Sequence, residues 1–504
     1  MATAAVNKPM LLRDTADSLR VSVLFLLALT VVQRGIGFVR KFLFCSWMAP
    51  DELGQWDIAF GFLTLAAALA VMGIPGALLR FAEHFRQRGH LRTYVWNTAI
   101  ATGLLGGLVT TLLLLLPSTS AQLFFGGREF ERLVVPVALT LAATVAFNAV
   151  MTLFTALRLQ RIRSLLTAAY ALLFTVLGSG LLLLWKPTAE SVIVAHCLSL
   201  AACFCLGAYW IWNSSHIQAR DAVATEGGGF YAKVMPFAMA VWVTNGLANL
   251  LPFLDRYMIL TFSGQPAEQA YSIVGQYHVA RLIPVFVFSL AQMLQATLLP
   301  YLCHDWELGN REKVNDRLDS FLRLFGLAFF AASALFLTVG PWLLTYLFGD
   351  KYEAGLAVLN LTLMHGVFAS LFVITQSYLW CDEQGWLVNL GLLIALLVNA
   401  GLNLLLLPRF GLQGAAIASC VGIVTLLLYV IYSSWLRGMR FQVATGIVAT
   451  LPLSFIAGPY LGLIVLGGAT VVAISSDVLL THEDKRQAAE LARRFGDFVA
   501  KRRS

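Results

Sequence analysis

The sequence predicts an all-α, polytopic membrane protein with about fourteen transmembrane helices. Three observations carry this prediction: the mean hydropathy is +0.77, only 12% of the residues are charged, and apolar runs of roughly 20 residues recur along the chain. A helix of that length is long enough to cross the hydrocarbon core of a bilayer. The polar segments between the runs are short, so no soluble domain of useful size is expected.

The predicted spans follow from the apolar runs and from the polar turns between them. Their approximate ranges are 21–48, 54–79, 93–117, 133–157, 164–185, 190–212, 234–262, 270–302, 322–347, 356–380, 386–407, 413–436, 441–458 and 460–480. The first span follows Lys8, Arg13 and Arg20, as a secretory signal would. It is nevertheless too long for a signal peptide, has Arg34 near its middle and lacks a small-residue cleavage site, so we expect it to be retained.

Lysine and arginine are distributed very unevenly over the predicted loops. If the N-terminus is cytoplasmic, the cytoplasmic flanks hold 25 of the 35 Lys and Arg residues, and the outer flanks hold 5. This bias follows the positive-inside rule, so both termini are expected in the cytoplasm. The net charge of +8 is then explained by the topology and the anionic inner leaflet, and nucleic acid is not an expected partner.

The chain lacks the sequence patterns of several enzyme and metal-site classes. Seven cysteines lie in or beside apolar segments, and Cys197, Cys203 and Cys205 lack C-x-x-C spacing, so we expect apolar packing rather than disulfides or a metal site. Neither a G-x-x-x-x-G-K-[ST] loop nor an H-E-x-x-H pattern occurs. We therefore predict that the protein is not an enzyme, with no catalytic and no metal-ligating residues.

A polar segment divides the chain into two halves that are similar to each other. This segment, residues 213–233, contains three consecutive glycines and is predicted to be a flexible linker. Residues 77–90 align with residues 297–310 at a constant offset of 220. Because each half has an even number of spans, both halves begin on the same side of the membrane and the repeat is parallel. Such a repeat predicts two pseudo-symmetric six-helix lobes around a central cavity.

The predicted domains follow this two-lobe architecture. They are an N-terminal lobe at 1–212 with spans 1–6, a cytoplasmic linker at 213–233, a C-terminal lobe at 234–436 with spans 7–12, spans 13 and 14 at 437–480, and a basic cytoplasmic tail at 481–504. The last two helices fall outside the repeat. The tail is typical of an amphipathic helix at the inner membrane surface.

Five cations lie inside the predicted spans, where a charge near the bilayer centre costs about 2.5–3.5 kcal/mol. They are Arg34, Arg40, Lys41, Arg256 and Arg281. Helical geometry places Arg34 close to the midplane, Lys41 on the same face and Arg40 about 120° away, and the glycines between them would permit a bend toward one space. We expect Arg34, Arg40, Lys41 and Arg281 to bind an anionic ligand with two phosphates, because a guanidinium fork matches phosphate oxygens. The alternatives are an internal ion pair for Arg34 and headgroup anchoring for Arg40 and Lys41.

The seventh span contains a carboxylate far from either end. Asp255 follows Asn245, Asn249 and a helix-disturbing proline in TNGLANLLPFLDRYMIL. A carboxylate at that depth is a candidate site for a coupling Na⁺ or proton, or it balances the cavity charge together with Arg256. The alternative is a local salt bridge from Asp255 to Arg256 or Arg281. Asn245 and Asn249 are candidate polar residues of the cavity.

Several segments resemble one known family in their order and spacing. They are QRGIGFVRKFLFCSWMAPDELGQWDIAFGFLTLAAALAVMGIPGALLRF (33–81), FLDRYMI (253–259), YHVARLIPVFVFSLAQMLQATLLPYL (277–302), LFGDKYEAG (347–355) and LNLLLLPRFGLQGAAIAS (402–419). The sequence resembles the polysaccharide (O-antigen or exopolysaccharide) flippases of the multidrug/oligosaccharidyl-lipid/polysaccharide (MOP) exporter superfamily. The resemblance covers nearly the whole chain and implies a fold similar to that of the MATE exporters.

The resemblance also implies a function. Such proteins move an undecaprenyl-diphosphate-linked oligosaccharide across the bacterial plasma (inner) membrane by alternating access, with membrane lipids and polysaccharide polymerase or export machinery as further partners. The lipid II flippases, a sister family, carry a pattern similar to R-G-I-G-F-V-R whose arginines are assigned to the lipid diphosphate, and Arg34 and Arg40 match them. The sequence lacks the long acidic-aromatic continuation of that group, so lipid II is the alternative cargo. No cofactor other than a coupling ion is implied.

Three other function classes remain as alternatives. One is a multidrug exporter of the same superfamily, which a net-positive first lobe disfavours because the usual cargo is cationic or amphipathic. Another is a polymerase or ligase acting on the lipid-linked sugar, which the short outer connections disfavour. The last is a scaffold that binds biosynthetic partners without transporting anything.

Overall fold

The computed structural model describes residues 19–213, 230–482 and 484–486. Within these ranges nearly every residue is helical and there is no strand, which confirms the predicted all-α class. The predicted N-terminal flank, most of the predicted linker and most of the predicted basic tail lie outside the described residues.

The first eight helices form what we call the N-terminal half. Their bounds, with one 3₁₀ turn, are α1 (Leu19–Trp47), α2 (Pro50–Ala70), α3 (Ile74–Gln87), α4 (Leu91–Leu115), α5 (Pro117–Phe125), η2 (Arg128–Phe130), α6 (Glu131–Ala156), α7 (Gln160–Leu184) and α8 (Ala189–Asn213). The predicted span 54–79 is divided between α2 and α3. Met72 and Gly73 separate them with φ angles of 46° and 70°, which a right-handed helix does not adopt.

The C-terminal half begins with α9. Its bounds are α9 (Phe230–Phe262), α10 (Ala267–Ala280), α11 (Leu282–Glu307), α12 (Arg311–Phe348), η4 (Gly349–Tyr352), α13 (Glu353–Leu356), α14 (Leu359–Thr375), α15 (Ser377–Cys381) and α16 (Gly385–Leu436), followed by α17 (Val443–Thr450), η5 (Leu451–Ala457) and α18 (Pro459–Ser475). The 52-residue α16 is kinked at Gly411, whose φ is 55°. It therefore covers two predicted spans, 386–407 and 413–436.

The predicted span 270–302 is not one continuous helix. The structure divides it at Arg281, between α10 and α11. Pro284 explains the division, because proline has no N–H to donate and its ring crowds the carbonyl group four residues earlier. Arg281 consequently lies at a helix joint rather than along an uninterrupted helix.

The helices have the length and the surface of membrane spans. Ten helical segments of the described chain are long and apolar enough to cross a membrane, and two shorter apolar stretches, 443–457 and 459–475, follow them. Large apolar side chains point outward, among them Leu184 (89% exposed), Leu104 (69%) and Ile474 (76%). Water would disfavour so much exposed apolar surface, whereas lipid accommodates it. The protein is therefore a multi-pass membrane protein.

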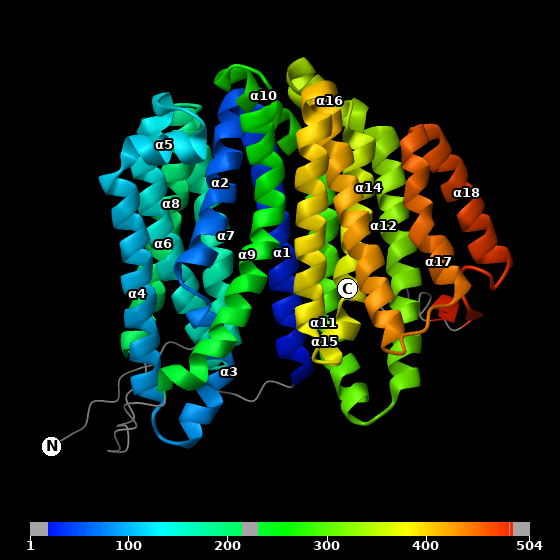
Figure 1. The fold of residues 1–504 in the computed structure, drawn as a ribbon, viewed down its shortest axis with the longest axis horizontal. Coiled ribbons are helices and arrows are strands. Elements are labelled where there is room, and N and C mark those ends of the chain that lie inside the picture. The colour runs from blue at the N-terminus through cyan, green and yellow to red at the C-terminus, as the bar shows by residue number, and fades with distance from the viewer. Residues whose placement is uncertain (1–18, 214–229, 483, 487–504) are drawn as a thin grey trace, which may run out of the picture.

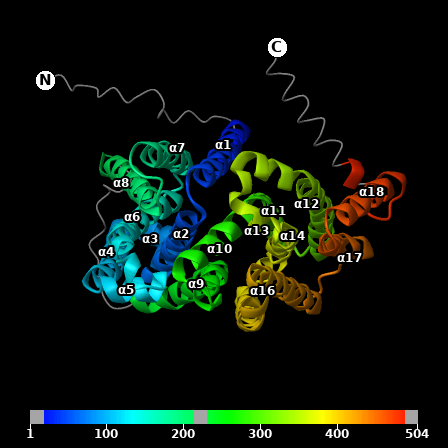
Figure 2. The same ribbon diagram turned by 90° about the horizontal axis from the view of Figure 1, so that it is seen from above.

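The helices form two side-by-side groups with shared helices between them (Figure 1). The helices α4 to α8 lie on one side, α11 to α18 on the other, and α1, α2, α9 and α10 lie in between, as the view from above also shows (Figure 2). We call the end with the α1–α2 turn the upper end and the end with the α3–α4 turn the lower end, as they are drawn in Figure 1. α2 packs against both α9 and α10, and α1 packs mainly against α7.

Two glycines bring the halves into backbone contact at the upper end. A Cβ added to Gly54 of α2 would lie 2.0 Å from the carbonyl oxygen of Tyr271, and one added to Gly275 of α10 would lie 1.9 Å from that of Pro50. The two approaches are equivalent under the repeat, because Gly275 follows Gly54 by 221 residues and Tyr271 follows Pro50 by the same number. We call this pair of approaches the upper glycine contact. Its symmetry agrees with a parallel repeat whose offset is one residue larger than the aligned segments suggest.

Two further contacts join the halves above and below. At the upper end, the Tyr352 hydroxyl donates to the main-chain oxygen of Cys45 at 3.0 Å, which ties η4 to the end of α1. Toward the lower end, Trp242 Nε1 of α9 donates to the carbonyl oxygen of Leu69 at 2.9 Å. The α2–α9 side of the molecule is therefore in contact along much of its height.

The start of the C-terminal tail is fixed to α12 by a buried ionic cluster. Asp484 accepts hydrogen bonds from Arg323 Nη2 at 2.8 Å and Nε at 3.0 Å, and Arg323 also pairs with Asp319 one turn away. Burial raises the pKa of Asp484, but hydrogen bonds from Ser320, Thr481 and Arg323 outweigh it and hold that pKa below its usual 3.8. This cluster positions the segment that follows α18 against the lower part of α12.

Candidate functional site

The cations of α1 point in different directions. Arg40 lies within the N-terminal half, with its guanidinium carbon 4.2 Å from the centre of the Phe174 ring and Nη1 donating to the Ala171 oxygen at 3.5 Å. Lys41 lies on the other side, in electrostatic range of Asp57. The bend that the glycines would permit is not made, because α1 is one continuous helix. Arg40 and Lys41 are therefore about 100° apart and do not share one space, whereas Lys41 stays on the same face of α1 as Arg34.

Arg34 lies deeper, about 20 Å below the upper end of α1 at the rise of an α-helix. It is half-buried, and its side chain has no hydrogen bond or ion pair with any described residue. The neighbouring Gln33 donates to the Ser164 oxygen at 2.8 Å and anchors this turn of α1 to α7. The predicted alternative of an internal ion pair is thus not formed by Arg34 within the described part of the chain.

An ion cluster joins the two halves just below the upper glycine contact. Asp57 of α2 is 2% exposed; its Oδ2 lies 3.1 Å from Arg256 Nε of α9, and its Oδ1 lies 2.8 Å from His278 Nδ1 of α10. Arg256 Nη1 also donates to the Asp57 main-chain oxygen at 3.2 Å. We call Asp57, Arg256 and His278 the inter-half ion cluster. Buried pairs of this kind stabilise their arrangement mainly because removal of one partner leaves an uncompensated charge.

Asp255 belongs to a separate network inside the C-terminal half. Its Oδ1 accepts from Asn399 Nδ2 and its Oδ2 accepts from the Ser419 hydroxyl, both at 2.7 Å. Tyr277 lies 3.1 Å from the same hydroxyl, and Asn403 donates to Asn399 Oδ1 at 3.1 Å. The predicted alternative of a local salt bridge to Arg256 is wrong, because adjacent helical residues diverge and the Arg256 side chain turns to α2.

Arg281 lies between these two networks. Its guanidinium carbon is 5.1 Å from the centre of the Tyr277 ring, and it is in electrostatic range of both Asp57 and Asp255. Its side chain forms no hydrogen bond or ion pair with the residues that the structure describes, and the same is true of Lys41. The predicted salt bridge from Asp255 to Arg281 is therefore not formed either.

The two asparagines predicted to line a cavity lie one turn apart on α9. Asn245 is exposed, and Asn249 is half-buried and donates from Nδ2 to the Asn245 main-chain oxygen at 2.8 Å. They lie below Asp255 on the same helix, and neither contacts the inter-half ion cluster. Their predicted role remains untested by the geometry.

The region between the two halves has an excess of positive charge and hydrogen-bond donors without acceptors in the part of the chain that the structure describes. Lys41, Arg256 and Arg281 contribute three positive charges against the two carboxylates Asp57 and Asp255. The donors of Lys41 and Arg281 have no acceptor among the described residues. The region between the halves can therefore accept an anion, which would supply the missing acceptors.

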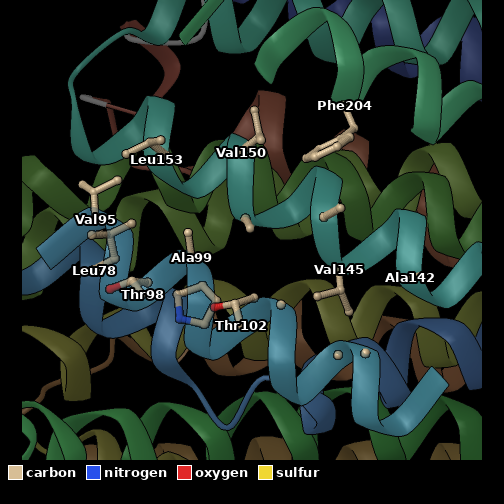
Figure 3. A pocket seen from close by; sticks show the side chains of 16 residues that line it. Leu78, Val95, Thr98, Ala99, Thr102, Ala142, Val145, Val150, Leu153 and Phe204 are labelled. Carbon is tan, nitrogen blue, oxygen red and sulfur yellow. The ribbon is translucent and has the colours of Figure 1, made fainter. Parts of the chain in front are cut away.

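Two apolar cavities lie elsewhere in the described part of the chain. One of about 380 Å³ lies inside the N-terminal half among α3, α4, α6 and α8 (Figure 3). Its lining is apolar apart from Thr98 and Thr102, and the Oγ1 atom of Thr102 has no hydrogen-bond partner among the described residues. A second, of about 460 Å³, is bounded by α2, α4, α5 and α9 and includes Trp242 and Phe253. No predicted site residue lines either cavity, so the central cavity remains a prediction.

No group of three or more His, Cys, Asp or Glu side chains within the described residues is placed to hold a metal ion. Two cysteines, Cys303 and Cys381, lie near each other with their sulfur atoms 3.3 Å apart, and both are free thiols.

Two residues of the site are not found by sequence reasoning. Asp57 lies only three residues inside the predicted span 54–79. A carboxylate so near the end of a span is ordinarily interpreted as a residue that water can reach. His278 is one of eight dispersed histidines. The repeat supplies a signal that would have found both, because position 57 corresponds to position 278 at the offset of 221 found at the upper glycine contact. Residues at equivalent positions near a pseudo-twofold axis lie close to one another.

Solved structures that share this fold include a flippase and transporters. The chain is similar to a lipid II flippase MurJ in an inward closed conformation, with a TM-score of 0.68 and 12% identity over 89% of this chain and 98% of that one. It is also similar to an inward-facing multidrug resistance MATE family transporter of the MOP superfamily, with a TM-score of 0.63 and 16% identity over 81% and 97% of the two chains. At these identities the likeness concerns the fold.

Comparison of sequences finds relatives of the same kind. The lipid II flippase MurJ of Bacillus subtilis (strain 168) is 22% identical over 439 residues, 79% of each chain. The uncharacterized membrane protein YabM of the same organism is 24% identical over 419 residues, 76% of this chain and 75% of that protein. Fold and relatives together define the class, a membrane flippase or transporter of the MOP superfamily. The sequence profile described as "Polysaccharide biosynthesis protein" matches residues 19–304, more than half of the chain, and the chain belongs to that family.

Proposed function

We propose that the protein moves an undecaprenyl-diphosphate-linked oligosaccharide from the inner to the outer leaflet of the bacterial plasma (inner) membrane, for O-antigen or exopolysaccharide synthesis. Transport proceeds by alternating access of the two halves. In this proposal the upper end faces outward and both termini lie in the cytoplasm, as the distribution of Lys and Arg favours.

One observation carries the proposal: cations from both halves meet at membrane depth with donors to spare. Lys41 comes from α1 and Arg281 from the α10–α11 joint, and neither has an acceptor among the residues that the structure describes. A diphosphate supplies several acceptor oxygens and compensates for the repulsion between these cations. The polyprenyl tail stays in lipid, so only the headgroup and the sugars need a polar path.

The roles of the other cations follow from their positions. Arg34 lies below Lys41 on α1 and would meet the diphosphate on its way through the lower part of the bundle. Arg40, held on Phe174, contributes positive potential from inside the N-terminal half rather than a direct contact. Asp255, fixed by two hydrogen bonds, serves as a counter-charge to Arg281 or as the site that couples transport to Na⁺ or protons. Asn245 and Asn249 would contact the sugars as the halves open.

The proposal is tested in proteoliposomes with a fluorescent undecaprenyl-diphosphate-linked oligosaccharide. A membrane-impermeant quencher reports which leaflet holds the glycan. Wild-type protein should speed the exchange, and Arg281→Ala and Lys41→Ala should slow it by about tenfold or more, since a charge-assisted hydrogen bond contributes about 1.5–3 kcal/mol. Vesicles with wild-type protein that exchange the lipid no faster than empty vesicles would refute the function.

Matched control variants show whether the loss of rate is specific to cations of the site or follows from removal of any surface cation. Arg409 and Lys186 are exposed at the upper end, so Arg409→Ala and Lys186→Ala should leave the rate within about twofold of wild type. Arg34→Lys should be slower than a conserved charge would suggest, because lysine cannot present two parallel donors. Replacing Na⁺ by K⁺, and imposing a pH gradient, show which ion drives transport.

Lipid II is the second candidate cargo. The 79% coverage by the MurJ relative and the R-G-I-G-F-V-R stretch of α1 favour it. Lipid II carries the same diphosphate and polyprenyl groups, so the two cargoes differ in their sugars. Competition between unlabelled lipid II and the labelled oligosaccharide lipid in the same vesicles ranks them directly. A multidrug exporter is disfavoured, because the excess positive charge between the halves repels cationic drugs.

A further inference from the structure

Asp57 provides a carboxylate at the place where the cations of both halves converge. Arg256 and His278 contact its two oxygens at 3.1 Å and 2.8 Å, and Arg281 and Lys41 are in electrostatic range. One buried carboxylate thus faces four groups that are cationic or can become so. Together these groups can compensate an anion with more than one charge, and Asp57 satisfies only part of that demand.

Local sequence keeps the contact between Asp57 and Arg256 close. Gly61 follows Asp57 by one helical turn, and a Cβ at Gly61 would lie 3.0 Å from Arg256 Nη1. The absence of a side chain there lets the guanidinium lie against α2. Arg256 Nε faces the carboxylate without a hydrogen bond, and Nη1 donates to the Asp57 main-chain oxygen, so Arg256 has donors to spare. A planar guanidinium can present two of its donors to a phosphate without a change in protonation.

The same contact closes the upper end of the molecule. Asp57 lies three residues after Gly54, and His278 lies three residues after Gly275, so the inter-half ion cluster follows directly below the upper glycine contact. Asp57 belongs to α2 in the N-terminal half, while Arg256 and His278 belong to the C-terminal half. Loss of these contacts removes a charged attraction between the halves and leaves helix packing and neutral hydrogen bonds, such as that from Tyr352 to Cys45, to hold the upper end.

We infer that Asp57 is an internal stand-in for the diphosphate, and that the arriving lipid diphosphate binds Arg281, takes Arg256 from Asp57 and thereby releases the upper contact between the halves. This inference rests on the proposed function. Asp57 is then a coupling residue: it does not bind the cargo but competes with it. Like charge prevents the carboxylate and the diphosphate from holding the same guanidinium at full strength, so binding of one weakens the other.

The test uses full-length protein in lipid nanodiscs with undecaprenyl diphosphate, the carrier without sugars, as the ligand. Spin labels at Gln122→Cys on α5 and Arg409→Cys on α16 report the distance between the halves at the upper end, after the exposed Cys205 is replaced. In wild type, the lipid should shift the distance distribution to longer values. In Asp57→Asn the longer distances should be populated without lipid, and the dissociation constant for the lipid should fall about tenfold, because the competing charge is gone.

Asp350→Asn is the matched control, because Asp350 is an exposed carboxylate at the upper end and is remote from the cluster. It should leave both readouts at wild-type values. Two results together would overturn the inference: Asp57→Asn binds the lipid no more tightly than wild type, and its distances without lipid equal those of wild type. If Asp57→Asn does not fold, wild type alone decides: saturating lipid that leaves the distance distribution unchanged also overturns it.

Failure of the proposed function has a different signature. Wild-type protein would then bind undecaprenyl diphosphate no better than a neutral polyprenol, whatever the distances show. If only the inference fails, wild-type protein still prefers undecaprenyl diphosphate to a neutral polyprenol, but Asp57→Asn changes neither the affinity for the lipid nor the distances.

Discussion

The upper glycine contact allows a quantitative prediction for Gly275→Ala. The added Cβ would lie 1.9 Å from the Pro50 carbonyl oxygen and 2.8 Å from its carbonyl carbon, whereas ordinary contact begins at 3.4 Å. Both atoms belong to the backbone and cannot rotate away. α2 and α10 must therefore separate by about 1.5 Å, a shift that overpacked interfaces resist at a cost of about 1–3 kcal/mol.

This cost falls only on the state in which the upper end is closed. It should reduce the population of that state relative to an opened one by about 5–150-fold. The spin-label pair at positions 122 and 409 measures the two populations, and thermal unfolding in detergent measures the loss of stability. Gly54→Ala should act in the same direction, because its Cβ would lie 2.0 Å from the Tyr271 oxygen.

Gly103→Ala is the matched control for both variants. Gly103 is a helical glycine of α4, and a Cβ added there would have no neighbouring atom within 4 Å. Alanine should therefore leave the distances unchanged and stabilise the helix by about 0.5–1 kcal/mol. Unchanged distances and unfolding temperature in Gly275→Ala would show that α2 and α10 are not held at backbone contact.

Three further predictions concern polar contacts outside the glycine pair. Tyr352→Phe removes a buried hydroxyl that donates to the end of α1, and should lower the free energy of unfolding by about 1–2 kcal/mol in denaturant titrations. Asn399→Leu leaves Asp255 short of a donor and should destabilise by about 2–4 kcal/mol, and adding Asp255→Leu should restore much of the loss; a double variant no more stable than the single one would contradict this. The depressed pKa of Asp484 means that its contact with Arg323 stabilises the fold above the ordinary carboxyl value of 3.8 and is lost as the pH falls through the lower folded-state pKa. The protection of the amides of residues 481, 482 and 484–486 against exchange, relative to their intrinsic rates, should thus stay high from pH 7 to about pH 4 and fall in stronger acid, whereas in Asp484→Asn it should be low throughout.

The sequence allowed the helical fold to be predicted because lipid imposes a simple requirement. Each crossing needs a long apolar helix, so the predicted ranges coincide with helices over most of their length. Breaks within those helices were not predicted. Met72 and Gly73, for example, have positive φ angles that depend on the packing of α3 against α9. One proline did mark the division at Arg281, but prolines such as Pro136 and Pro252 lie inside continuous helices.

Prediction of the site was limited in a different way. The cost of a charge in lipid singled out Lys41, Arg256 and Arg281, and the structure does bring these three together. The same argument could not say which way Arg40 points, because helical periodicity gives relative angles and not the direction of the neighbouring half. Asp57 was missed because burial by a second half cannot be read from one span.

The closing surface at the upper end is built from main-chain atoms, and this has a consequence for how such transporters diversify. Pro50 and Tyr271 contribute carbonyl groups that every amino acid possesses, so the fit depends on the smallness of Gly54 and Gly275 and hardly on chemistry elsewhere. Under the proposed function, side chains that select the sugar can then change over evolutionary time without disturbing this contact between the halves. A swap of cargo preference between family members should accordingly need substitutions in the lower and middle bundle alone.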